Sequence, residues 1–73
     1  MKVIVALYEH RHGTDVVVFD SEEKAEAWRA EIAEQYWDHC EFENDPAFNV
    51  DLYWDEMNEA GREWFSYEWY EVQ

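Results

Sequence analysis

Two short hydrophobic runs near the N-terminus have the pattern of β-strands. Residues 3–8 form a run of β-branched, aliphatic and aromatic residues, and residues 15–19, Asp-Val-Val-Val-Phe, are of the same kind. The polar segment between them contains Gly13, which readily adopts the positive φ angles of a turn. We therefore expect a β-hairpin. Its first strand is apolar on both faces, as in strands that are central or covered at an interface; one face carries Val3, Val5 and Leu7, and the other Ile4, Ala6 and Tyr8.

The next segment has the pattern of a helix over residues 21–38. Ala25, Trp28, Ile32 and Tyr36 recur at intervals of three and four residues, which places them on one helical face. Asp20-Ser21 offers a capping oxygen, and residues 22 and 23 add glutamates to the first turn, where the helix dipole favours negative charge. This segment is the single helix that we expect.

The C-terminal part alternates between apolar and polar positions. Phe48, Val50, Leu52 and Trp54 follow a two-residue period, which favours a strand over residues 47–54. Asp45-Pro46 is an alternative start for a second helix, but these apolar residues scatter at helical spacing. Residues 55–61 then form a turn, and residues 62–72 form a last strand with Phe65, Tyr67 and Trp69 on one face.

The predicted fold is α+β, in the order ββαββ: a four-stranded antiparallel sheet with one helix packed on one face. No linker or internal repeat is visible, so we expect one domain over residues 1–73. The five Trp, five Tyr and four Phe residues supply the core of this short chain.

The net charge narrows the possible functions more than any other property of the sequence. The chain has 19 Asp and Glu against five Lys and Arg, a formal net charge of −14. This charge disfavours binding to nucleic acid or anionic lipid, and the aromatic content excludes a disordered acidic tail. Acidity also rises along the chain, from a net −4 over residues 1–36 to −10 over residues 37–73.

The acidic half also carries most of the aromatic residues. Trp and Tyr are favoured anchors at interfaces, and carboxylates around them steer a basic partner. We therefore predict a partner-binding surface that includes Asp38, Glu41, Glu43, Asp45, Asp51, Asp55, Glu56, Glu59, Glu63, Glu68, Trp54 and Trp64.

In size, acidity and α+β make-up the whole chain resembles the small phage and mobile-element proteins that imitate DNA, the anti-CRISPR and anti-restriction inhibitors. The stretch Tyr8-Glu9-His10-Arg11-His12-Gly13-Thr14-Asp15, followed by Phe19-Asp20-Ser21-Glu22-Glu23, is also similar to small proteins of phage type. The resemblance implies a stoichiometric inhibitor whose carboxylates occupy the basic groove of a nuclease or CRISPR effector subunit and exclude nucleic acid. It would act in the cytoplasm, that of the host cell if the protein is phage-encoded.

Other functions have weaker signals. His10 and His12 alternate on a strand and would need His39 or Cys40 to complete a zinc site, but this is not a recognised ligand spacing. We expect no metal, no cofactor and no enzyme activity, because a phosphate-binding loop is missing and the carboxylates beside Cys40 would raise its thiol pKa.

The alternative function is an acidic structural or halotolerant domain that acts as a homodimer through exposed aromatics such as Trp54, Trp64 or Tyr70. The single cysteine rules out an intrachain disulfide and, together with the absence of a long apolar run, fits a cytoplasmic protein without a membrane segment.

Overall fold

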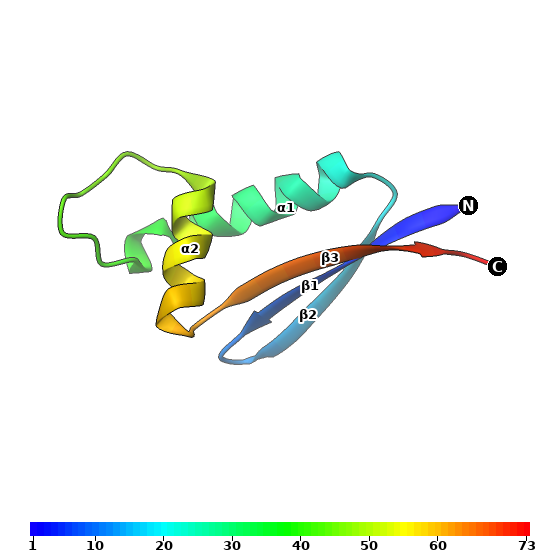
Figure 1. Ribbon diagram of the computed structural model, residues 1–73, viewed down its shortest axis with the longest axis horizontal. Coiled ribbons are helices and arrows are strands. Elements are labelled where there is room, and N and C mark those ends of the chain that lie inside the picture. Colours follow the sequence, from blue (N-terminus) through cyan, green and yellow to red (C-terminus); the bar gives the residue numbers. More distant parts are fainter.

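The computed structural model describes residues 1–73 as three strands and two α-helices, with one turn of 3-10 helix between the helices (Figure 1). The elements are β1 (Lys2–His10), β2 (Gly13–Phe19), α1 (Glu22–Gln35), η1 (Trp37–His39), α2 (Val50–Ala60) and β3 (Trp64–Glu71). The strands form one antiparallel sheet in the order β2-β1-β3. The first strand is therefore the central one, as its two apolar faces indicate.

The N-terminal hairpin is confirmed, with a turn shorter than the predicted one. Residues 11 and 12 alone connect the strands, and His10 pairs with Gly13, whose φ of 132° is easily reached only by glycine. Register then places alternate residues on opposite faces of the sheet. Ile4, Ala6 and Tyr8 of β1 are buried beneath the helices, whereas Val3, Val5 and Leu7 point to the other side and stay half-exposed.

The predicted first helix is also confirmed, and it begins where the capping residues indicate. The Ser21 side chain accepts a hydrogen bond from the Lys24 amide, which satisfies one of the free N–H groups of the first turn. Of its apolar stripe, Ala25 and Ile32 are buried and Trp28 is half-buried. The α-helix ends at Gln35, and η1 continues the chain to His39.

The predicted four-stranded ββαββ sheet with one helix is wrong. Residues 50–60, expected to be strand and turn, form α2. Asn49 accepts a hydrogen bond from the Leu52 amide at its start. Gly61 ends the helix at φ 68°, and a Schellman motif forms there: the Gly61 amide donates to Asn58, and the following amide donates to Met57.

The apolar spacing explains why a helix forms here. Val50, Tyr53, Trp54 and Met57 lie at intervals of three, one and three residues, so they share one helical face that packs on the core. Leu52, which completes the apparent two-residue alternation, lies on the opposite side of the helix from this face and is half-exposed.

The core lies between the helices and one face of the sheet. Its buried side chains come from β1, α1 and α2, and the half-buried Phe65 of β3 packs against them. Aromatic edges meet at close range: the Tyr8 and Trp54 ring centroids are 5.9 Å apart and nearly perpendicular, a favoured arrangement. Only nine of the 73 residues are buried, so the core is small even for a chain of this length.

The molecule is longer than a compact domain of this size. Its radius of gyration is 13.5 Å and its extents are 48 × 23 × 17 Å, whereas about 11 Å is typical for a compact chain of 73 residues. The sheet extends past the helices toward the two termini, and the segment between η1 and α2 projects at the opposite end (Figure 1). Where the helices do cover the sheet, they lie on one of its faces only.

Candidate functional site

The charge of the protein is divided between two parts of the fold. The helical layer, which we define as residues 20–63 with α1, η1, α2 and their connections, contains 15 acidic and three basic residues. The strands and termini, residues 1–19 and 64–73, contain four acidic and two basic residues. The helical layer thus carries a net −12 and the sheet only −2. The charge follows the layers of the fold rather than the halves of the sequence.

Most carboxylates of the helical layer face solvent without a cation. Only three of them form an ion pair with Lys or Arg, namely Asp20, Glu26 and Asp51. The hydrogen bond from Lys24 to Asp20 lowers the pKa of that carboxyl. The carboxylates that are neither ion-paired nor hydrogen-bonded within the fold are Glu23, Glu31, Glu34, Asp38, Glu41, Glu43, Asp45, Asp55, Glu56 and Glu59.

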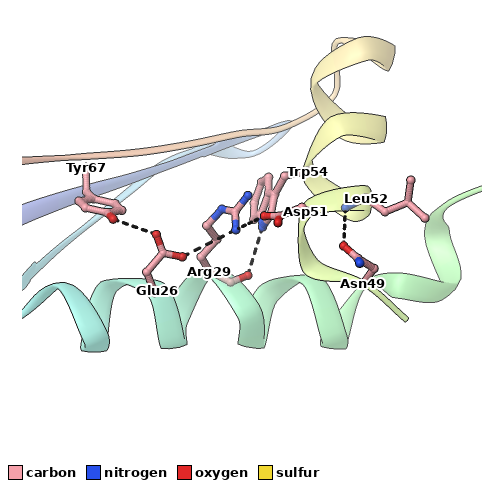
Figure 2. A network of polar contacts seen from close by, with 7 residues as sticks. All are labelled: Glu26, Arg29, Asn49, Asp51, Leu52, Trp54 and Tyr67. Carbon is pink, nitrogen blue, oxygen red and sulfur yellow. Dashed lines mark hydrogen bonds and ion pairs between the residues drawn. The ribbon is translucent and has the colours of Figure 1, made fainter. Parts of the chain in front are cut away.

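Arg29 is the one cation that joins the two helices. Its guanidinium lies 3.1 Å from a carboxylate oxygen of Asp51 on α2 and 3.7 Å from Glu26 one turn earlier on α1. It also lies 6.0 Å above the ring of Trp54, whose indole N–H donates to the Arg29 carbonyl oxygen at 3.2 Å (Figure 2). On the sheet side, the Tyr67 hydroxyl donates to Glu26 at 2.8 Å, which raises the pKa of Tyr67 to about 12. This network fixes the helices to each other and to β3.

Glu63 has a structural role that the sequence pattern did not reveal. One of its carboxylate oxygens accepts hydrogen bonds from the hydroxyls of Tyr8, at 2.9 Å, and Tyr53, at 2.7 Å. Burial, together with these hydrogen bonds, raises the pKa of both tyrosines well above their usual range. The carboxylate therefore connects the central strand to α2 through one of its two oxygens.

The structure separates the predicted partner-binding residues into four groups. Asp38, Glu41, Glu43, Asp45, Asp55, Glu56 and Glu59 belong to the unpaired carboxylates of the helical layer. Asp51 and Glu63 are engaged within the fold, as described. Trp54 is 3% exposed, so it is a core residue and not a surface anchor. Glu68 and Trp64 lie on the sheet, on the side away from the helices. Glu31 and Glu34 of α1, assigned to the less acidic half of the sequence, join the layer.

The sheet face that points away from the helices, which we call the open face, has the opposite character. Register aligns Val18 with Val5 and Val16 with Leu7, and Tyr70 with Val3. Val16 and Val18 are 58% and 59% exposed, and no helix covers them. Among the strand residues, the charged ones on this face are Glu9 at one end and Glu68, which pairs with Val5 in the middle of β3. The Lys24–Asp20 ion pair lines a hollow beside Val3 and Val18. The apolar members of the open face are Val3, Val5, Leu7, Val16, Val18 and Tyr70, with Trp64 at one end.

The histidines and Cys40 do not converge on a metal. No group of three His, Cys, Asp or Glu side chains is arranged to hold an ion. His10 is hydrogen-bonded to Asp15 at 3.1 Å, and the Cys40 thiol is half-buried, with its pKa raised by burial and by nearby glutamates. The largest cavity, about 540 Å³, lies between the hairpin turn and the end of α2, and its lining includes Arg11 and Arg62.

Comparisons with protein-family models, with curated proteins and with solved structures give no match for this chain. Neither of its helices has the length and apolar character needed to span a membrane.

Proposed function

We propose that the protein is a non-catalytic inhibitor that presents its acidic helical layer to the basic surface of a nucleic-acid-binding enzyme, as anti-CRISPR and anti-restriction DNA mimics do. The observation that carries this proposal is the division of charge, −12 in the helical layer against −2 in the sheet. Most of these carboxylates are exposed and without a cation. A basic groove that binds phosphates would meet a surface of negative charge, as it does in its nucleic acid.

The density of charge supports a nucleic-acid-like surface of a particular kind. A net −14 along the 48 Å length of the molecule is one charge per roughly 3.4 Å, which is the phosphate spacing along one DNA strand and half the density of a duplex. The chain therefore resembles a single polyphosphate strand more closely than a double helix. This favours targets whose groove holds one strand, such as a displaced or guide-paired strand.

The positions of some acids also favour a role outside the fold. Glu34 and Glu59 lie in the last turns of α1 and α2, and neither turn contains a basic residue. The C-terminal end of a helix carries a partial negative charge, so a carboxylate there is unfavourable by a few tenths of a kcal/mol. Charge that lowers stability yet faces solvent is better explained by binding than by folding.

The test is competition for a nucleic-acid site, with two charge-reversal variants that change net charge equally. The layer variant carries Glu34→Lys, Asp55→Lys and Glu59→Lys, all exposed in the helical layer. The matched sheet variant carries Glu9→Lys, Glu68→Lys and Glu71→Lys. Each has a net charge six units less negative than the wild type. The readout is displacement of a labelled oligonucleotide from purified CRISPR effectors and restriction enzymes, followed by fluorescence anisotropy.

We expect the wild type to displace the oligonucleotide from at least one enzyme, with an affinity that falls about tenfold or more as salt rises from 50 to 200 mM. The layer variant should compete at least about tenfold more weakly, and the sheet variant should stay close to the wild type. Equal losses in both variants would mean that net charge, and not the helical layer, determines binding. Competition that is indifferent to salt, or none with any enzyme tested, would contradict the proposal.

A further inference from the structure

The open face is an exposed apolar surface in a protein that is otherwise highly charged. Its valines come from the central strand and one edge strand, and Tyr70 and Trp64, 50% and 44% exposed, lie toward its two ends. Monomeric proteins rarely leave a contiguous apolar patch of more than a few hundred Å² exposed to water. Antiparallel sheets can face water on one side, but that side is then usually polar. Here valines and Leu7 occupy β1 and β2, whereas β3 carries Ser66 and Glu68, with Glu68 directly opposite Val5.

The size of this face fits a weak dimer of small subunits. Three strands of seven to nine residues cover roughly 400 Å² in projection, at about 3.3 Å per residue and 4.8 Å between strands. Covering such a face on two copies would bury roughly 800 Å² in projection, which is at the low end for specific interfaces and fits a weak, concentration-dependent dimer.

The charge distribution allows a second copy of the chain to pack against the open face. Two open faces packed together would place the helical layers on the outside. Stacked sheets lie about 10 Å apart and a helix is about 10 Å across, so the axes of the two helical layers would be separated by roughly 30 Å. That distance is several times the Debye length of about 8 Å at physiological ionic strength. Repulsion between two layers of net −12 would therefore be largely screened.

We propose that the protein forms a two-fold symmetric homodimer in which the open faces pack against each other, with Val5, Val16 and Val18 at the centre of the interface. The burial compensates for a core of only nine residues, since small domains without disulfides commonly gain stability from subunit contacts. Both acidic helical layers remain exposed in this dimer, so it presents two copies of the same anionic surface. This inference does not depend on what that surface binds.

The test is sedimentation velocity of the full chain between about 1 and 200 μM, at 0.15 M and 1 M NaCl. The interface variant is Val18→Lys, at a position 59% exposed in the single chain. The matched control is Ala27→Lys, which adds the same charge at an exposed position of α1 in the helical layer. A Val16→Thr, Val18→Thr double variant keeps the β-branched shape and guards against loss of folding, which circular dichroism reports.

We expect a dimer for the wild type and for Ala27→Lys, held equally or more tightly at 1 M NaCl because apolar burial is not screened. Val18→Lys should weaken the dimer at least about tenfold, a change of about 1.4 kcal/mol, and the threonine variant should weaken it less while remaining folded. A wild type that is monomeric at every concentration overturns the proposal. It is also overturned by dimers that survive in both open-face variants, because association would then use another surface such as the outer edge of β2.

Discussion

The helical layer and the open face differ in almost every property that governs binding. The first has a net charge of −12 and acidic side chains on both helices, whereas the second is valine-rich on β1 and β2 and carries only the carboxylates of Glu9 and Glu68 on its strands. The central strand separates the two surfaces: alternate residues of β1 point into the core beneath the helices or out onto the open face. A chain of 73 residues can thus present two unlike surfaces because a single sheet separates them.

Because of this difference, the two surfaces should respond to salt in opposite ways. Contacts made by exposed carboxylates weaken as ions screen them, whereas contacts made by valines are maintained or strengthened. A single salt titration therefore assigns any observed association to one surface or the other. The variants below test the structural basis of this contrast, in order of decreasing expected effect.

The largest expected effect is a loss of free energy of unfolding, and it differs between two tryptophans on opposite sides of the sheet. Trp54→Ala removes a buried ring and its hydrogen bond to Arg29, and should lower the free energy of unfolding by about 3–5 kcal/mol. Trp64→Ala, at a residue 44% exposed, should cost less than about 1 kcal/mol. Urea denaturation at about 1 μM, where a dimer contributes little, measures both. Similar losses would mean that the sheet is covered on both sides.

The next effect concerns the tyrosines that meet at Glu63. Tyr53→Phe removes a hydrogen bond to a charged acceptor and should lower stability at neutral pH by about 1.5 kcal/mol or more. The pKa of Tyr53 is raised in the folded chain, so above pH 10 the unfolded chain loses this proton first and stability falls as pH rises.

Tyr53→Phe should therefore lose less stability above pH 10 than the wild type, by about 1.4 kcal/mol per pH unit for each proton removed. Urea midpoints measured from pH 8 to 11 give this slope for both proteins. Parallel pH profiles would show that Tyr53 titrates alike in the folded and unfolded chain.

A smaller effect is expected when the N-cap of α2 is removed. This cap helps residues 50–60 to form a helix, which brings their carboxylates into the helical layer. Asn49→Ala should cost about 1 kcal/mol, because the amide of Leu52 loses its acceptor. Asn49→Asp keeps an acceptor and adds a negative charge at the helix N-terminus, so it should retain or exceed wild-type stability. Thermal unfolding followed by circular dichroism distinguishes the two, and equal stabilities would indicate that the cap contributes nothing.

The smallest expected effect is the loss of stability when the ion pair between the two helices is broken. A double-mutant cycle with Arg29→Met and Asp51→Asn should give a coupling of about 0.2–1 kcal/mol that decreases at 1 M NaCl, since the Asp51 side chain is 82% exposed. The same cycle on Lys24 and Asp20, whose side chains are 62% and 73% exposed, should give a smaller coupling than the pair that contains the 21% exposed Arg29. A larger value for the second pair would contradict the role of Arg29 as the cation that joins α1 and α2.

Local patterns in the sequence predicted the first half of the fold correctly. The β-branched runs, Gly13 and the Ser21 cap act through neighbouring residues, so their effects do not depend on the rest of the chain. The last strand, expected over residues 62–72, is also confirmed as β3 (Trp64–Glu71). Residues 47–61 were predicted incorrectly because Phe48, Val50, Leu52 and Trp54 fit a two-residue period by coincidence. The Asn49 cap, the terminating Gly61 and the stripe from Val50 to Met57 were all visible, and together they outweigh that alternation.

The candidate site could be predicted only in part from the sequence, for a different reason. Acidity was evident, but its distribution depends on which segments share a layer, and this is a property of the tertiary fold. Dividing the chain at residue 36 separated Glu31 and Glu34 from the carboxylates of α2 that belong to the same layer. The burial of Trp54 and the engagement of Glu63 by two tyrosines likewise depend on long-range packing that no local pattern reports.

The strand order β2-β1-β3 has a consequence for synthesis of the protein. β1 pairs with β3 through residues about sixty positions apart, such as Val3 with Tyr70, so one edge of the central strand has no partner until β3 has been synthesised. An unpaired edge is a site of aggregation. The emerging chain already carries most of its negative charge by then, and mutual repulsion between nascent chains would protect that edge until β3 arrives.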